Sequence, residues 1–179
     1  MGILTEDMKR VVREQRLGFI ATVCPDGTPN LSPKGTTTVW DDDHLVFAHL
    51  CSPGTVENLR HNPAIEINVV DQIVRKGYRF KGTARVLTAG PLFEEIRASY
   101  QPGRWSAGRV HGPTAEAPQN GEAVRADVAG RIEAVVLVKV ERALALISPA
   151  YDGGATEADV SARWAAYFNA LRETQRISR

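Results

Sequence analysis

The sequence predicts a mainly β protein, an antiparallel β-barrel with peripheral helices and Greek-key-like connections, built as a single domain over residues 1–179. Two observations carry this prediction. Short segments rich in β-branched and aromatic residues follow one another across turn residues, as in successive hairpins. Helical segments are few and do not alternate with the strands, which argues against a doubly wound parallel sheet. A barrel is the arrangement that leaves such a sheet with the fewest exposed edges.

The chain opens with a predicted helix over residues 5–15. Thr5 fits the N-cap, and two acidic residues follow it in the first turn, where the helix dipole favours negative charge. The apolar stripe of this helix consists of Met8, Val11 and Val12. Residues 17–23, LGFIATV, form a short apolar segment that predicts a buried strand, and CPDGTP after it is a turn by its Pro, Asp and Gly content.

Two further strands are predicted over residues 30–39 and 44–50, joined by the acidic turn Asp41, Asp42 and Asp43. We interpret these three carboxylates as a solvated hairpin turn. The segment SPGTVENLRHNP then breaks the β pattern. Its Ser fits an N-cap, its first Pro fits the first helical position, and Asn-Pro ends the helix.

The strands AIEINVVD and GYRFKGTARVLT follow, and cationic and polar side chains share one face of the second: Arg79, Lys81, Thr83 and Arg85. Pro91 opens a helix that carries Phe93, Ile96 and Tyr100. Residues 101–130 lack periodicity and predict an irregular insertion. A long strand over residues 131–147 precedes a C-terminal helix over residues 156–174. Its apolar stripe, which suits core or dimer packing, consists of Val160, Trp164, Tyr167, Phe168 and Leu171.

The charge balance predicts neither a nucleic-acid nor a membrane partner. Lys and Arg number 22 and Asp and Glu 21, so the formal net charge is +1. No apolar run reaches the roughly 18 residues that a membrane-spanning helix needs. The two cysteines, Cys24 and Cys51, show neither a disulfide framework nor metal-ligand spacing. We therefore expect a cytoplasmic protein without a metal site.

The strand over residues 30–39 carries a row of hydrogen-bond donors. With a period of two, one face holds Asn30, Ser32, Lys34, Thr36 and Thr38. A solvated outer face is one interpretation. Pro33 and Gly35 favour another, because Pro withholds a ladder hydrogen bond and Gly allows a close approach. A donor-rich strand of this kind suits the edge of a planar heteroaromatic ring, and Lys34 would place positive charge near it.

The start of the helix at residue 52 is a second candidate feature. The first N–H groups of a helix are unpaired and attract anions, and Ser52 and Thr55 add hydroxyl donors there. Arg79 and Lys81 on a later strand are cations that could join a phosphate site. The alternative is a plain capped helix, because Ser is a common N-cap.

The order of these pieces resembles the pyridoxamine 5′-phosphate oxidase-like FMN-binding split-barrel family. The resemblance rests on LGFIATVCPDGTPNLSPKG, on LVFAH leading to SPGTVENLRHNP, and on GYRFKGTARV. It covers about residues 5–90 and continues more weakly through VVLVKVERALALISPAYDGG. No single piece is specific, but the ordered set is.

The resemblance implies a split β-barrel that binds FMN without a covalent bond at a homodimer interface. It places Ser32, Pro33, Lys34 and Gly35 along the isoalloxazine ring. It places Ser52, Thr55 and Asn58 near the ribityl phosphate, and it makes Arg79 and Lys81 contacts of the phosphate or of the second subunit. No side chain is assigned as a catalytic acid or base.

Two departures from the family pattern shape the predicted function. Some members use an Arg-Lys pair for the phosphate where this chain has Ser-Pro-Gly-Thr, and the C-terminal Arg-x-His signature of true vitamin B6 oxidases is missing. The prediction is an FMN-dependent oxidoreductase that acts on another small molecule. The alternative is a binding or carrier protein of the same fold for flavin, haem or another tetrapyrrole. A deazaflavin cofactor is a variant within the enzyme class.

Overall fold

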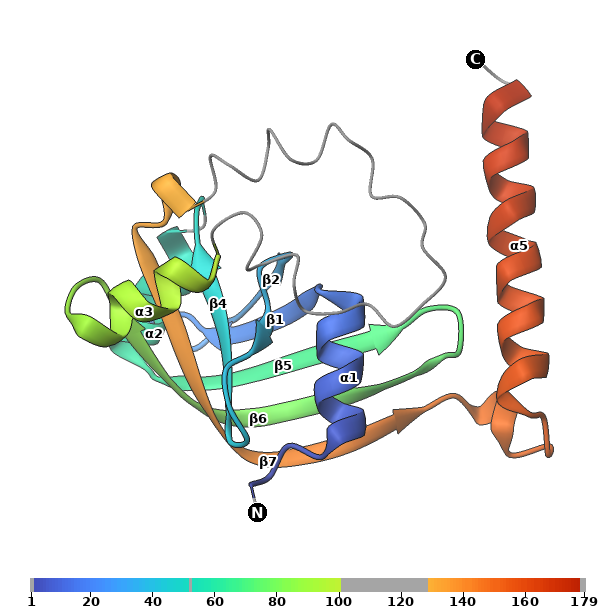
Figure 1. The fold of residues 1–179 in the computed structure, drawn as a ribbon, viewed down its shortest axis with the longest axis horizontal. Helices are drawn as coiled ribbons and strands as arrows, with labels where there is room; N and C mark the ends of the chain where they lie inside the picture. The colour runs from blue at the N-terminus through green and yellow to red at the C-terminus, as the bar shows by residue number, and fades with distance from the viewer. Residues whose placement is uncertain (1, 52, 101–128, 178–179) are drawn as a thin grey trace.

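The computed structural model describes residues 2–51, 53–100 and 129–177, so the insertion predicted over residues 101–130 lies almost entirely outside the described residues. Figure 1 shows the arrangement of the elements. In chain order they are α1 (Glu6–Gln15), β1 (Gly18–Val23), β2 (Pro29–Lys34), β3 (Thr38–Val39), β4 (His44–His49), α2 (Pro53–His61), β5 (Ala64–Asp71), β6 (Lys76–Leu87), α3 (Pro91–Ser99), a 3-10 turn (Ala129–Arg131), β7 (Ala134–Ile147), a second 3-10 turn (Pro149–Tyr151) and α5 (Glu157–Ile177).

The strands form one antiparallel sheet of seven, in the order β2-β1-β5-β6-β7-β4-β3. Strands β2 and β3 lie at opposite edges, yet only three residues join them. A flat sheet of this size would separate its edges by about 29 Å, whereas four Cα–Cα steps span at most about 15 Å. The sheet must therefore curl until its edges approach without pairing, which is a split barrel. Strand β4 lies beside β7 while β5, β6 and β7 form a meander, a Greek-key arrangement.

The predicted strand over residues 30–39 is two strands, so the expectation of one continuous donor face was wrong. Strand β2 ends at Lys34, and β3 begins at Thr38. Asn30, Ser32 and Lys34 share a face as predicted, but Thr36 does not continue it, because its hydroxyl bonds to β4 instead. Thr36 Oγ1 donates to Ala48 O and accepts from Ala48 N, both at 3.0 Å.

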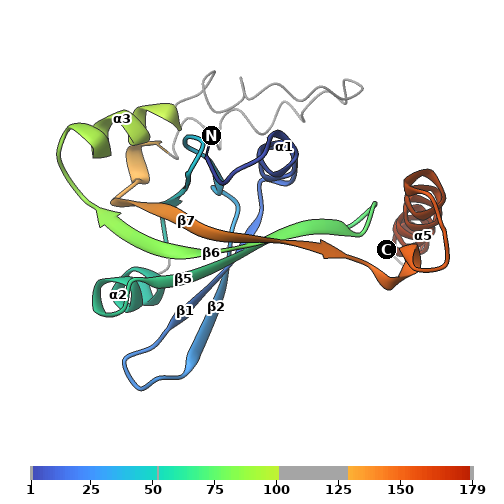
Figure 2. The ribbon, with the colours of Figure 1, turned by 90° about the horizontal axis from the view of Figure 1, so that it is seen from below.

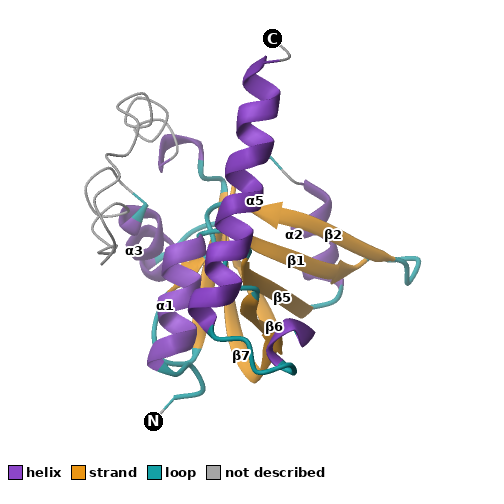
Figure 3. Cartoon of the chain, turned by 90° about the vertical axis from the view of Figure 1, so that its right-hand side faces the viewer, coloured by secondary structure: helices purple, strands orange, loops and turns teal. Residues whose placement is uncertain are grey.

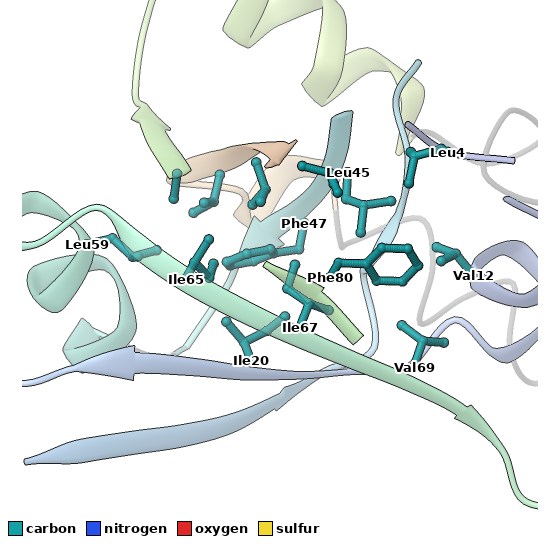
Figure 4. Packing of buried hydrophobic residues seen from close by; sticks show 14 of the residues in the cluster. Leu4, Val12, Ile20, Leu45, Phe47, Leu59, Ile65, Ile67, Val69 and Phe80 are labelled. Atoms are coloured by element: carbon teal, nitrogen blue, oxygen red, sulfur yellow. The ribbon is translucent and has the colours of Figure 1, made fainter. Parts of the chain in front are cut away.

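The main core fills the inside of the curled sheet (Figure 4). Alternate residues of β5 and β6 point inward as the period-two pattern predicts, so Ile67 and Phe80 are almost completely buried. Helix α1 closes one end, with Thr5 as its N-cap and with Val11 and Val12 buried. The acidic turn helps to hold this helix, because the Asp42 carboxylate accepts from Lys9 Nζ. The turn is therefore a solvated loop that also holds helix α1 to the sheet.

A second core lies on the other face of β4 and β7, under helix α3. Phe93, Ile96 and Tyr100 are all buried there, as the sequence predicts. The Tyr100 hydroxyl donates to Thr36 O at 2.9 Å, so the end of α3 holds the turn between β2 and β3. Burial raises the pKa of the Tyr100 phenol, which keeps it a neutral donor.

Helix α5 extends from the far end of the β6–β7 ribbon and stands apart from the barrel (Figures 1, 2 and 3). Only Val160 of its predicted stripe is fully buried, and Tyr167 and Leu171 are exposed. Trp164 stacks against the Arg75 guanidinium, whose carbon lies 3.5 Å from the ring centroid. In the described part of the chain, no helix is long and apolar enough to cross a membrane.

Candidate functional site

The inner face of the β1–β2 hairpin carries the first three members of the predicted donor row, Asn30, Ser32 and Lys34. The pairing register sets Gly18 opposite Lys34, Ile20 opposite Ser32 and Thr22 opposite Asn30. Residues that face each other across a ladder share one side of the sheet. The row therefore adjoins the barrel core at Ile20, and it lies on the edge strand at the open seam of the barrel.

Lys34 is the unusual member of this row, because only 6% of it is exposed. Its Nζ donates to Ser32 Oγ at 2.6 Å. No carboxylate among the described residues forms an ion pair with it, and burial lowers the pKa of its amine. A buried cation without a counter-charge is costly for a protein. Such a group fits a site that receives negative charge from a ligand.

The backbone just after Lys34 is held by three side chains. Thr37 is completely buried, and its hydroxyl donates to Lys34 O at 2.9 Å. Thr36 joins the turn to β4, and Tyr100 joins it to α3. These contacts close the turn and join it to two other elements, β4 and α3, so they fix the direction in which β2 presents Lys34. The sequence pattern did not reveal them.

Pro33 and Gly35 lie in different surroundings. Pro33 pairs with Phe19 on the outer face of the hairpin and is exposed there. Gly35 has no described atom within 4 Å of the position that a Cβ would take. No described part of this chain therefore requires a glycine at this position. The space beside the backbone is open to a ligand. A contact between either residue and a flavin ring stays a prediction.

Helix α2 starts shortly after the end of β4. Ser52 lies outside the described residues, and the side chain of Thr55 is buried, with 2% of the residue exposed. Asn58 fastens α2 to β1, because its amide nitrogen donates to Thr22 Oγ1 at 3.0 Å. A second amide, that of Asn30, donates to the same hydroxyl at 3.1 Å. The predicted phosphate contacts of Ser52, Thr55 and Asn58 stay predictions.

Arg79 and Lys81 lie on the outer face of the sheet, opposite to the inner face that carries Lys34. Across the ladder, Pro33, Phe19, Asn68 and Arg79 form one row, and Leu31, Ala21, Glu66 and Lys81 form the next. These are the outer-face rows, whereas Ser32, Ile20, Ile67 and Phe80 form an inner-face row.

This placement sets the pair apart from Lys34 within one chain. Arg79 also forms an ion pair with Glu66, with 3.1 Å between its Nε and the carboxylate. One chain does not bring Arg79 and Lys81 to the ligand side of Lys34. Their predicted roles, as contacts of the phosphate or of the second subunit, stay predictions.

His49, at the end of β4, is a further candidate residue of the site. It is 8% exposed, and burial lowers the pKa of its imidazole. The charges of Lys34 and Arg60 lower it further, while Glu133 opposes them. Near neutral pH, His49 is therefore an uncharged hydrogen-bonding group in the electrostatic neighbourhood of Lys34. Its position just before a predicted anion-binding helix start was the available signal.

A family model described as pyridoxamine 5′-phosphate oxidase matches residues 4–132. The chain belongs to the pyridoxamine 5′-phosphate oxidase family. The resemblance identified from the sequence is thus confirmed, and the split barrel is the fold that this family membership predicts. No curated protein matches the sequence.

Solved structures support the same fold. The crystal structure of HupZ from Group A Streptococcus is 31% identical, with a TM-score of 0.60 over 80% of this chain and 94% of that one. An FMN-binding protein from Syntrophomonas wolfei is 14% identical, with a TM-score of 0.56 over 79% of this chain and 85% of that one. An F420 reductase is 22% identical, with a TM-score of 0.51 over 78% and 98%. The last two likenesses concern the fold alone.

The chemistry that the described residues offer is binding and electrostatic. Within the described part of the chain there is no group of three or more His, Cys, Asp or Glu residues placed to hold a metal ion. Cys24 and Cys51 are free thiols. The candidate site combines a buried amine at Lys34, a neutral imidazole at His49 and the hydroxyl of Ser32, groups that can hold a ligand by charge and by hydrogen bonds.

Proposed function

We propose that this member of the pyridoxamine 5′-phosphate oxidase family is an FMN-dependent oxidoreductase. It would transfer a hydride or electrons between a reduced donor and a small molecule other than a vitamin B6 phosphate. The observation that carries the proposal is the buried Lys34 on the inner face of β2, which has no ion-pair partner among the described residues and lies beside the open seam of the barrel.

The described residues fit such a cofactor in two respects. Lys34 lacks a carboxylate partner within the described residues, and a ring that gains electron density would compensate its charge. The open space at Gly35 leaves the adjoining backbone accessible to a flat ligand. FMN supplies the redox chemistry when it is bound. The chain contributes a fixed cation at Lys34 and a hydroxyl at Ser32.

Lys34 is the residue to which we assign the tuning of the cofactor. Positive charge held close to a flavin favours the form with more electron density, so it raises the reduction potential. The turn contacts of Thr36, Thr37 and Tyr100 keep the amine in place and reduce the reorganisation that this stabilisation requires. Ser32 Oγ accepts a hydrogen bond from the Lys34 amine and thereby orients the amine.

We also propose that the active form is a homodimer with flavin near the subunit interface. The outer face of β1 and β2 exposes apolar side chains, including Leu31 at 65% and Phe19 at 38%. Exposed apolar side chains that cluster on one face are typical of interaction sites. Arg79 and Lys81 stand on the same face, where they would reach a flavin bound by the other copy. Sedimentation measurements at several protein concentrations test this arrangement.

The first experiment is the visible absorbance spectrum of the purified protein, before and after addition of FMN and desalting. We expect a retained two-band flavin spectrum at one FMN per chain. A protein that remains colourless after FMN addition would overturn the flavin proposal and direct attention to haem and deazaflavin titrations. Steady-state turnover with NADH and NADPH then separates an oxidoreductase from a carrier protein.

The role of Lys34 is tested with Lys34→Ala and the control Lys76→Ala. Lys76 is paired with Glu157 of α5, with 2.9 Å between Nζ and the carboxylate, so it has its own partner elsewhere. We expect Lys34→Ala to raise the Kd for FMN by roughly tenfold or more, the loss of one charge-assisted contact, and to lower the flavin potential. Unchanged affinity and potential would remove Lys34 from the site.

A further inference from the structure

A groove lies on the outer side of the barrel, between the start of α3 and the β3–β4 hairpin. Its lining includes Trp40, His44, Thr83, Arg85, Leu92 and Lys139, and its volume is about 470 Å³. Cavities of this size hold small organic ligands in many proteins. The groove begins where the second core ends, since Trp40 and Leu92 pack against that core.

The strand register brings its polar members together. Lys139 of β7 lies directly opposite His44 of β4 on one side and Thr83 of β6 on the other. Leu137, two residues earlier on β7, lies opposite Arg85. Three adjacent strands thus place His44, Lys139 and Arg85 on one patch of sheet, and rigid strands hold functional groups better than loops do.

His44 is oriented by a carboxylate. Its Nδ1 lies 2.8 Å and 3.0 Å from the two oxygens of Asp41. Asp41 is itself fixed, because it accepts the backbone N–H groups of Asp43 and His44, both at 2.8 Å. With Nδ1 bound to the carboxylate, Nε2 is the ring atom available to a ligand. The hairpin is closed by Trp40 N donating to His44 O at 2.9 Å, which sets Trp40 beside His44.

Among the described residues that line the groove, Arg85 and Lys139 are cations and Asp41 is a carboxylate. Arg85 and Lys139 are exposed, and neither forms an ion pair with any described residue. The Asp41 carboxylate is bound to His44, and Glu141, which does not line the groove, accepts from the Thr83 hydroxyl at 2.7 Å. Two unpaired cations beside an indole and two leucine side chains match a ligand that is flat at one end and anionic at the other.

We propose that this groove is a second binding site, separate from the flavin site, for a small aromatic anion that carries a carboxylate or a phosphate. The aromatic ring lies against Trp40 and Leu92, and the anionic group is bound by Arg85 and Lys139. His44 Nε2 contributes a hydrogen bond whose direction Asp41 fixes. The site faces away from the inner surface that carries Lys34 and Ser32, so it does not depend on the proposed oxidoreductase activity.

The test is an NMR titration of the full chain with phenyl phosphate and, separately, benzoate, in the presence and absence of saturating FMN. The indole N–H resonance of Trp40 is assigned by its loss in Trp40→Phe. We expect a saturable shift of this resonance that persists with FMN present. Inorganic phosphate has the anionic group without the ring, and phenol has the ring without the anionic group. Each should bind at least roughly tenfold more weakly than phenyl phosphate. The ratio of phenyl phosphate to benzoate affinity shows which anionic group the site prefers.

Variants locate the site. Arg85→Gln and Lys139→Gln should each weaken phenyl phosphate binding by roughly tenfold, the loss of one charge-assisted hydrogen bond. The control is Arg97→Gln, which removes an arginine of α3 that pairs with Glu94 and does not line the groove. Amide spectra of each variant establish that the fold is intact.

Three results would overturn the proposal. One is a Trp40 resonance that does not move, or that moves without saturating. Another is equal binding by phenol, which would mean an apolar patch without an anion site. The third is loss of the shift when FMN is added, which would assign the binding to the flavin site. Failure of FMN binding itself leaves the Trp40 titration unaffected, so the two proposals fail separately.

Discussion

The two faces of the wall formed by β2, β1, β5 and β6 use the same residue types for different purposes. The inner face carries Phe80, Thr22 and Lys34, all buried, and the outer face carries Phe19, Thr83 and Lys81, all exposed. On the inner face these two polar groups have partners: the Thr22 hydroxyl accepts from two amides, and Lys34 Nζ donates to Ser32 Oγ. The outer-face groups contact solvent or exposed neighbours.

Position in the ladder, more than residue type, therefore determines which side chains can form a site. Two lysines on neighbouring parts of one sheet, Lys34 and Lys81, cannot serve one ligand within a single chain because they point to opposite sides. Matched substitutions on the two faces test the distinction, since each pair changes the same chemical group.

The largest expected effect comes from the phenylalanine pair. Phe80→Ala should lower the free energy of unfolding by about 3–5 kcal/mol, because Phe80 is 1% exposed and its removal leaves a cavity. Phe19→Ala should cost about 1 kcal/mol or less, as expected at a partly exposed position. Urea denaturation at low protein concentration, where association is weak, measures both. Equal losses would mean that the outer face is packed as tightly as the core.

The threonine pair gives the next largest effect. Thr22→Val keeps the shape but removes the acceptor of two amide donors, from Asn30 and Asn58. Leaving buried donors unpaired costs about 1–3 kcal/mol. Thr83→Val removes an exposed hydroxyl bonded to Glu141 and should change stability by less than about 0.5 kcal/mol.

Amide hydrogen exchange measures the local effect of the same two substitutions. Faster exchange at the α2 amides in Thr22→Val would show that this hydroxyl fastens α2 to β1. Unchanged α2 protection together with unchanged stability would contradict the role assigned to Thr22.

Much of the fold follows from local sequence signals. The N-cap Thr5, the alternation in β5 and β6 and the buried stripe of α3 were predictable, because each depends on residues close in sequence. The break after Lys34 was not. Residues 36–38 are three threonines, which favour a strand, and the contacts that turn the chain there come from Ala48 and Tyr100.

The candidate site was harder to predict than the fold for the same reason. Periodicity assigns alternate residues to two faces within one strand, but only the register between strands tells which faces coincide. Lys34 could be proposed from its strand alone, whereas the separation of Arg79 from it required the pairing through β1 and β5. The groove at His44 likewise depends on β4, β7 and β6 lying side by side.

The lysine pair gives the smallest effect on stability and the most direct test of the comparison. Lys34→Met should raise the free energy of unfolding of the flavin-free protein by about 1 kcal/mol, because it removes a buried charge that has no partner among the described residues. Lys81→Met, on the exposed face, should be neutral within about 0.5 kcal/mol.

The pH dependence has a defined sign for Lys34. Burial lowers the pKa of its amine below the ordinary 10.5, so at neutral pH the folded state carries a charge that the unfolded state holds more easily. As pH rises through the folded-state pKa towards 10.5, the folded protein loses this proton first, and the penalty disappears. The advantage of Lys34→Met should therefore be constant near neutral pH and shrink towards pH 10.5. An advantage that persists unchanged at high pH would mean that the gain comes from packing and that the Lys34 charge is not the cost.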